Sequence, residues 1–245
     1  AFISNYLLKG FDGANDWRWM LGVEAIPALI YSILVLKIPN SPRWLVITKK
    51  DDVAALKTLE FLSNKEHAKE KLLEIKTSSD KDKGKESLFT LKYKTPLILA
   101  FLLAFFNQLS GINFILYYAP EILERAGLAA KESLFSSISI GIVNLIFTLV
   151  GIRLIDKMGR RQLMKIGSIG YILSLSMVGW CFYTGASSTL LLIFILVFIA
   201  SHAIGQGAVI WVFISEIFPN KVRAFGQAWG TGTHWVFAAI ITLIT

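Results

Sequence analysis

Long apolar stretches recur along the chain, and each is followed by a shorter segment richer in charged or turn-forming residues. Each stretch is about 20 residues long, which is the length that an α-helix needs to cross the hydrocarbon core of a bilayer. The pattern therefore predicts an all-α, polytopic membrane protein. The predicted spans are Trp17–Ile38, Thr95–Leu116, Phe135–Ile155, Met164–Tyr183, Leu190–Phe213 and Ala224–Thr245.

The composition agrees with spans that lie in lipid. Hydrophobic residues make up 54% of the 245 residues and charged residues 17%, and the mean hydropathy is +0.58. A typical soluble domain has about 45–50% apolar and roughly 25% charged residues, so a water-soluble enzyme of this composition would expose too much apolar surface. Cys181 is the single cysteine. It excludes an internal disulfide framework, and we expect an inert thiol on an apolar helix.

The net charge of +8 is unevenly distributed among the connections between the predicted spans. Residues 37–94 hold 14 Lys and Arg, residues 153–165 hold five and residues 221–223 hold two, whereas the connections 119–134 and 183–189 hold two and none. Short cytoplasmic loops of membrane proteins are rich in Lys and Arg. The basic segments are therefore predicted to be cytoplasmic and the other two to face outward. Because topology accounts for the basic charge, no nucleic-acid partner is predicted.

The basic stretch Ser41–Leu91 differs in composition from the rest of the chain. Apolar residues recur at helical spacing in 53–62 and 72–75, which predicts short amphipathic helices on the cytoplasmic face. Their lysines could bind anionic lipid, but the neighbouring acidic residues favour a plain solvated face. Residues 77–87 are predicted to form a solvated linker.

Polar side chains gather in the second predicted span, in the segment Asn107–Tyr118 (NQLSGINFILYY). Asn113 and Tyr117 are four residues apart and share a helix face, whereas Gln108 lies off that face in an unbroken helix. Local unwinding at Ser110–Gly111 would let the two amides converge on one ligand. Amides suit hydroxyl groups because each has a donor and an acceptor, but such residues also join neighbouring helices. Spacing alone leaves both interpretations open.

Four motifs in a fixed order resemble those of the sugar porter family of the major facilitator superfamily. They are PNSPRWL at Pro39–Leu45, NQLSGINFILYY at Asn107–Tyr118, DKMGRR at Asp156–Arg161 and WVFISEIFPNKVRA at Trp211–Ala224. The resemblance covers essentially the whole chain, and it implies the major facilitator helical bundle with cytoplasmic amphipathic helices. It also implies a fragment that runs from the end of the fifth helix to the eleventh of twelve.

The same resemblance implies a division of the chain. Residues 1–40 would be the end of an N-terminal six-helix half, with Ala1–Leu8 as the tail of its fifth helix. Residues 41–94 would form a cytoplasmic helical linker, and residues 95–245 an incomplete C-terminal transmembrane half. A multi-pass protein of the cell membrane is expected, and it would need the missing N-terminal half for function.

The resemblance implies sugar contacts in the motif on the seventh transmembrane helix of the family. Asn107, Gln108 and Asn113 would contact the sugar, and Tyr117 and Tyr118 would close over it from outside. Asn107 stands where the family usually has Gln, so the shorter amide keeps the chemistry but changes the reach.

Four further sugar contacts are implied in later helices, at Asn144, Trp211, His234 and Trp235. The segment Gly205–Gly207 before Trp211 keeps the glycines of the family pattern but lacks its prolines. His234 stands where Asn or Gln is common. Its expected role is a hydrogen bond at the cavity, and the alternatives are a packing histidine or a titrating switch.

The resemblance also implies a cytoplasmic gate, formed by charged residues at the inner ends of the spans. Opposite charges at the same membrane depth on neighbouring helices can pair, whereas a topology signal alone would not explain the acids among them. Asn40 replaces the Glu of the usual PESPR motif, so a looser lock is expected. The gate residues are Asp156, Arg160, Arg161, Glu216, Arg223 and Arg43.

Glu24 is the only acid well inside the first predicted span, and an ionisable group there is a functional candidate. It could take part in proton coupling, or it could pair with Arg18 in the membrane interface, which is the interpretation that we prefer. The proton-coupled relatives carry an acid in their first helix, which lies outside this chain. The choice between proton symport and facilitated diffusion therefore stays open.

These observations predict a membrane transporter that moves a monosaccharide, either a hexose or a pentose, by alternating access. Its partners would be the sugar, the lipid bilayer and, in a symporter, protons. The runner-up is a transporter-like sugar sensor that does not transport. An enzyme is not predicted, because no nucleophile–base set or phosphate loop occurs, and no cofactor is expected. His67 and His202 have no metal-ligand spacing, so no metal site is predicted.

Overall fold

The computed structural model describes residues 2–81 and 86–244 and is 84% helical. No strand occurs in these ranges, and the predicted all-α class is confirmed. The chain forms two compact units. The larger contains the residues up to Met20 and from Ser87 onward, and the smaller is Leu21–Glu86.

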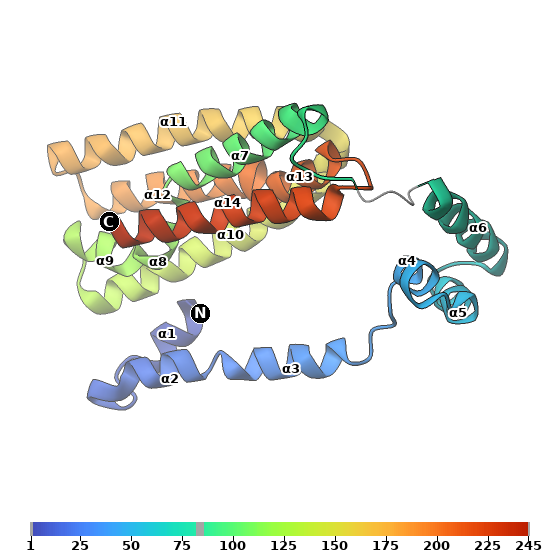
Figure 1. Cartoon of the computed structure of the whole chain (residues 1–245). Coiled ribbons are helices and arrows are strands. Elements are labelled where there is room, and N and C mark those ends of the chain that lie inside the picture. Colours follow the sequence, from blue (N-terminus) through green and yellow to red (C-terminus); the bar gives the residue numbers. More distant parts are fainter. Residues whose placement is uncertain (1, 82–85, 245) are drawn as a thin grey trace. The chain divides into compact units, whose positions relative to one another are not determined.

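Long helices that run side by side make up the larger unit (Figure 1). α7 lies beside α14, α11 beside α12, and α10 beside both α12 and η4. The elements of this unit are α1 (Phe2–Leu8), η1 (Gly13–Asn15), the start of α2 (Asp16–Gly22), η3 (Leu91–Tyr93), α7 (Lys94–Leu109), α8 (Ile112–Tyr117), α9 (Ala119–Arg125), α10 (Ala130–Met158), α11 (Arg160–Thr184), α12 (Ser188–His202), η4 (Ala203–Gly207), α13 (Ala208–Ile217) and α14 (Arg223–Ile244).

Apolar side chains cover the outer faces of these helices. On α10, the side chains of Leu145 and Leu149 are 62% and 52% exposed, although they lie in the middle of the helix. Apolar surface of this kind is unfavourable in water and favourable in hydrocarbon, because of the hydrophobic effect. The chain is therefore a multi-pass membrane protein, as predicted.

Five stretches among the described residues are long and apolar enough to cross a membrane: Gly13–Val35, Leu91–Tyr117, Ala130–Met158, Arg160–Thr184 and Ser188–Ile217. They correspond to the first five predicted spans. The sixth, 224–245, is the helix α14, which has the length but is less apolar. Its buried positions include Gly226, Gly230, Thr233 and His234, so polar and small residues replace aliphatic ones where α14 packs against its neighbours.

Two glycines form a close helix crossing in the larger unit. Gly167 on α11 and Gly205 in η4 face each other, and a Cβ added to Gly205 would lie 2.6 Å from the Cα atom of Gly167. Small residues of this kind let membrane helices approach closely enough for their backbones to touch. The contact fixes α11 against the π-helical turn η4, which connects α12 to α13.

The smaller unit contains α3 (Ala25–Val35), α4 (Pro42–Trp44), η2 (Leu45–Lys49), α5 (Asp52–Leu62) and α6 (Lys65–Lys81). α5 begins with a cap in which the Asp51 side chain accepts a hydrogen bond from the backbone N–H of Ala54 at 2.9 Å. Ala55 and Ala68 are fully buried. Lys76 Nζ on α6 lies 2.5 Å from Asp52 Oδ2 on α5, and this ion pair links the two helices.

The predicted linker 77–87 is partly wrong, because α6 continues through Lys81. The hydroxyl of Thr77 donates to the backbone carbonyl of Leu73 at 2.7 Å, and that of Ser78 donates to Ile75 at 2.9 Å. Side chains that could have ended the helix bond back to it instead. Residues 82–85 of the predicted linker lie outside the described residues.

Candidate substrate-binding cavity

A helix break lies at the centre of the polar segment. α7 ends at Leu109 and α8 begins at Ile112, and between them Gly111 has a φ of 76° in the left-handed region. Glycine adopts this conformation without steric cost. The hydroxyl of Ser110 donates to the backbone carbonyl of Asn107 at 2.6 Å and satisfies one group at the end of α7. The break therefore lies at the pair Ser110–Gly111, where the sequence allowed it.

The break brings three amide side chains and one imidazole together. Asn113 Nδ2 donates to Gln108 Oε1 at 2.9 Å, although the two residues lie on different helices. Gln108 Nε2 in turn lies 3.0 Å from Asn107 Oδ1 and 2.9 Å from His234 Nε2 on α14. Both polar atoms of Gln108 are thus engaged, and the network joins α7, α8 and α14.

One polar atom of this network has no partner among the described residues. Asn107 is 2% exposed, and its Nδ2 atom is buried without a hydrogen bond. Leaving a buried donor unpaired costs about 1–3 kcal/mol. Such a donor at the wall of a cavity favours a site at which a ligand or a water molecule accepts its hydrogen bond.

The network lines a cavity of about 320 Å³. Trp211 lies with its ring centroid 4.8 Å from that of His234, and Trp235 is 5.3 Å from the same ring. Polar amides and apolar indole faces therefore border one space. Of the predicted sugar contacts, the cavity is lined by Asn107, Gln108, Asn113, Asn144, Trp211, His234 and Trp235.

The two predicted tyrosines do not line this cavity. The Tyr117 side chain is 58% exposed, and Tyr118 borders a separate cavity of about 630 Å³ that also contacts Ser110 and residues of α11 and α12. Tyr118 is five residues from Asn113, which places it about 140° around the helix and so away from the amides. Closure over the site by these residues stays a prediction.

The sequence interpretation missed other residues that line the cavity. Thr148 lies four residues after Asn144 and so on the same face of α10, a signal that was available in the sequence. His202 ends the apolar helix α12, where no local pattern distinguished it from a packing histidine. The hydroxyl of Tyr171 on α11 lies 2.8 Å from His202 Nδ1.

Comparison with known proteins shows the family to which the chain belongs. The family described as "Sugar (and other) transporter" matches residues 1–245. The chain belongs to the sugar transporter family. An arabinose-proton symporter of Bacillus subtilis (strain 168) is 35% identical over 253 residues, covering 92% of this chain and 54% of the relative. A D-xylose-proton symporter of Escherichia coli (strain K12) is 34% identical over 222 residues, covering 91% and 45%.

Another relative of this sugar transporter chain is named a glucose facilitated diffusion protein. It comes from Zymomonas mobilis and is 30% identical over 250 residues, covering 100% of this chain and 53% of the relative. The chain spans about half the length of the curated relatives it matches.

Two solved structures of sugar transporters have folds similar to that of this chain. The proton:xylose symporter XylE bound to 6-bromo-6-deoxy-D-glucose matches with a TM-score of 0.84 and 31% identity, covering 98% of this chain and 52% of that chain. XylE from Escherichia coli in an inward open conformation matches with a TM-score of 0.75 and 31% identity, covering 98% and 50%. The major facilitator fold is therefore confirmed.

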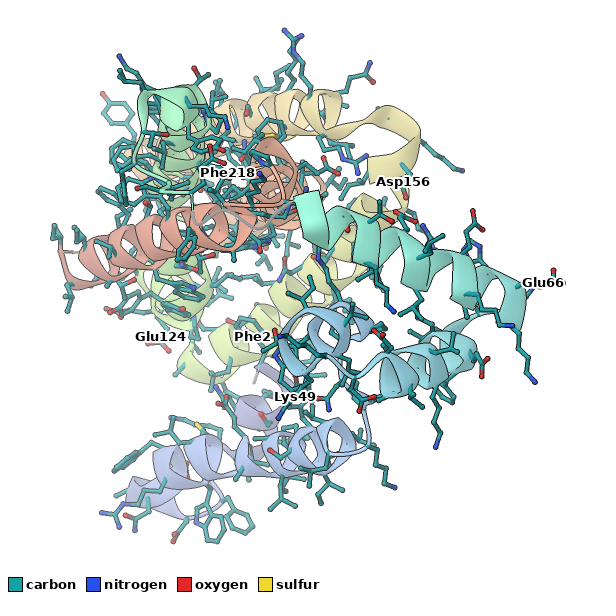
Figure 2. All side chains as sticks on the ribbon, turned by 45° about the vertical axis from the view of Figure 1, so that its right-hand side comes forward. Phe2, Lys49, Glu66, Glu124, Asp156 and Phe218 are labelled. Atoms are coloured by element: carbon teal, nitrogen blue, oxygen red, sulfur yellow. The ribbon has the colours of Figure 1, made fainter. Side chains whose placement is uncertain are left out.

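Five of the six predicted gate residues of this sugar transporter chain lie in the larger unit, at the end of α10, the start of α11, the end of α13 and the start of α14. Figure 2 shows Asp156, near the C-terminal end of α10, well separated from Glu124 on α9, the helix that precedes α10. Beside Asp156, Arg160 begins α11 and makes two hydrogen bonds to Glu216 on α13, at 2.7 Å and 3.1 Å. Arg160 also lies 3.6 Å from Asp156 Oδ1. Three of the predicted residues therefore form a linked cluster.

The remaining charged candidates differ in their surroundings. Arg161 is exposed next to Arg160, and Arg223 Nε donates to the backbone carbonyl of Phe218 at 3.3 Å. Arg43 on α4 and Glu24, which is exposed just before α3, belong to the smaller unit. Their roles in a gate and in proton coupling stay predictions.

Proposed function

We propose that the protein is a carrier that binds a neutral monosaccharide, a hexose or a pentose, in the 320 Å³ cavity and moves it across the membrane by alternating access. The observation that carries this proposal is the buried Asn107 amide, whose donor has no partner among the described residues, at a cavity whose lining includes further amides, imidazoles and indoles. A sugar hydroxyl would accept this hydrogen bond.

The chemistry of the cavity supports a neutral, polyhydroxylated ligand. Among its described lining residues there is no Asp, Glu, Lys or Arg. A charged ligand would therefore be buried without a counter-charge, at a large cost. Hydroxyl groups can both donate to and accept from amides, and the C–H faces of a sugar can pack on Trp211 and Trp235.

The names of the relatives support a sugar as the substrate class but do not single out one sugar. One relative is named for arabinose, one for D-xylose and one for glucose. Two of these are named proton symporters and one a facilitated diffusion protein, so both modes of transport occur among similar proteins. We propose Glu24 as the residue of this chain to test for proton coupling.

Alternating access needs a barrier on each side of the site that opens in turn. We propose that the Arg160–Glu216 cluster closes the cytoplasmic side. In this proposal residues 1–40 end the N-terminal half, residues 41–94 link the halves, and residues 95–245 contribute the wall of the site described here.

The test uses the full-length carrier that contains this chain, reconstituted in vesicles with a panel of labelled pentoses and hexoses. We expect saturable binding and counterflow of at least one neutral monosaccharide, and no binding of its uronic acid. Binding without counterflow would instead support a sensor. If no monosaccharide binds, the proposed function is wrong.

A further inference from the structure

His202 is a buried polar residue in the wall of the cavity with no role in the sequence motifs. Its side chain is 8% exposed, and it borders the same space as Asn107 and Trp211. It ends the otherwise apolar helix α12, directly before the π-helical turn η4. A polar ring in such a place is costly unless both of its nitrogens are used.

Tyr171 on α11 fixes the orientation of this imidazole. The tyrosine hydroxyl lies 2.8 Å from His202 Nδ1, and the two rings stack with centroids 5.8 Å apart and an angle of 13° between their planes. Nδ1 is the only acceptor that the described residues offer to this hydroxyl. Because a buried hydroxyl donates where an acceptor is available, Nδ1 accepts and the proton of the neutral ring lies on Nε2.

The Nε2 edge of the ring points toward the part of the wall that Gly207 forms. A Cβ added to Gly207 would lie 3.3 Å from His202 Nε2 and 3.2 Å from Cδ2, so glycine keeps this edge clear. Gly207 lines the same cavity. Among the described residues no hydrogen bond to Nε2 is formed, and Nε2 is not one of the fully buried atoms that lack a partner, so it stays accessible.

We propose that the Nε2–H group of His202 donates a hydrogen bond to a hydroxyl or ring oxygen of the bound monosaccharide, and that Tyr171 is a positioning residue for it. This inference rests on the proposed function. It adds a donor from α12 to the amides of α7 and α8, and it selects sugars that present an oxygen to this wall. A deoxy sugar that lacks this oxygen would leave Nε2–H unpaired.

The experiment measures the affinity of the full-length carrier for one sugar that it binds and for each monodeoxy analogue of that sugar. His202→Phe keeps the ring and removes the donor, and Tyr171→Phe keeps the stacking and removes the hydroxyl. We expect each variant to bind the parent sugar about five- to thirtyfold more weakly. The deoxy analogue that lacks the oxygen paired with Nε2–H should bind to His202→Phe and to the wild type with equal affinity, because neither can form the hydrogen bond. Tyr183→Phe, on the same helix but 91% exposed, is the matched control.

The double variant separates a positioning role from general damage. If Tyr171 acts through His202, then adding Tyr171→Phe to His202→Phe costs no further affinity. Equal affinity of both single variants and the wild type for every analogue would overturn this inference while leaving the proposed function intact. If His202→Phe does not fold, Tyr171→Phe alone decides. A wild-type carrier that binds no monosaccharide would instead refute the proposed function.

Discussion

Arg160 at the start of α11 holds Glu216 near the end of α13 through two parallel hydrogen bonds, from Nε to Oε2 at 3.1 Å and from Nη2 to Oε1 at 2.7 Å. The Arg160 side chain is 31% exposed and that of Glu216 48%. Two-point contact of this kind fixes geometry as well as charge. The pair therefore joins two helices at the end of the bundle that carries the basic segment 153–165.

We predict that Glu216→Gln and Arg160→Ala shift the full-length carrier toward its inward-open state. Partial exposure limits the contribution of the pair to about 1 kcal/mol, or roughly fivefold in the equilibrium between the two states. Net uptake should slow, and binding of an inhibitor from the outside should weaken. The measurement is inhibitor binding from each side of the membrane.

Glu121→Gln is the matched control for this experiment. Glu121 pairs with Arg125 at 2.8 Å within α9, an exposed pair on a single helix that joins no two helices. It should leave side preference unchanged. If Glu216→Gln and Arg160→Ala also leave the preference for inhibitor binding from one side unchanged, these charges serve only as a topology signal.

We predict that Gln108→Ala and Asn113→Ala weaken sugar affinity without preventing membrane insertion. Each removes a partner from a buried network, at a cost of about 1–3 kcal/mol, or roughly five- to 150-fold in affinity. Titration of the purified carrier with sugar is the measurement. Gln162→Ala, an exposed amide on α11, should have no effect. Normal sugar binding by well-folded Gln108→Ala protein would show that the amides only join helices.

We predict that Gly111→Ala destabilises the carrier by about 1–2 kcal/mol, because alanine is strained at a φ of 76°. No atom lies within 4 Å of the added Cβ, so the effect is purely conformational. Gly179→Ala is the control, since Gly179 also has open space around its Cβ position but lies inside α11. That change should be neutral or stabilising. Similar melting temperatures for the two variants in detergent would contradict the prediction.

We predict that Gly167→Ala destabilises the protein by about 1–3 kcal/mol, because the added methyl group overpacks the crossing of α11 and η4. Its Cβ would lie 2.8 Å from the Cα atom of Gly205, where a backbone cannot yield as a side chain can. Gly232→Ala on α14, which has open space, serves as the control. Thermal unfolding that is equal in the two variants would rule out a tight crossing.

We predict that a cysteine at Glu124 is labelled by an impermeant reagent in intact cells and that a cysteine at Asp156 is not. Asp156 lies near the C-terminal end of α10 and Glu124 on α9, which precedes the other end of α10, and the basic loop containing Asp156 is expected to be cytoplasmic. The native Cys181 is buried and should give little background. Labelling at Asp156 in sealed cells would reverse the assigned orientation.

The sequence was informative wherever the signal was local. Apolar runs predicted the spans, and Ser110–Gly111 marked the break that brings Gln108 and Asn113 together across five residues. Contacts between distant residues could not be read in this way. His234 lies 126 residues from Gln108, and Tyr171 lies 31 residues from His202 on another helix. Only the packing of α11 on α12 brings the latter pair together.

The short helix α13 begins directly after η4 and carries both Trp211 at the cavity and Glu216, which pairs with Arg160. The two residues are five positions apart, or about 7.5 Å along the axis, on a helix with no internal break. A tilt of α13 that adjusted Trp211 to a ligand would therefore move Glu216 relative to Arg160. Thermodynamic linkage makes this coupling reciprocal: by whatever factor the ion pair changes the affinity for the ligand, the ligand changes the stability of the ion pair by the same factor.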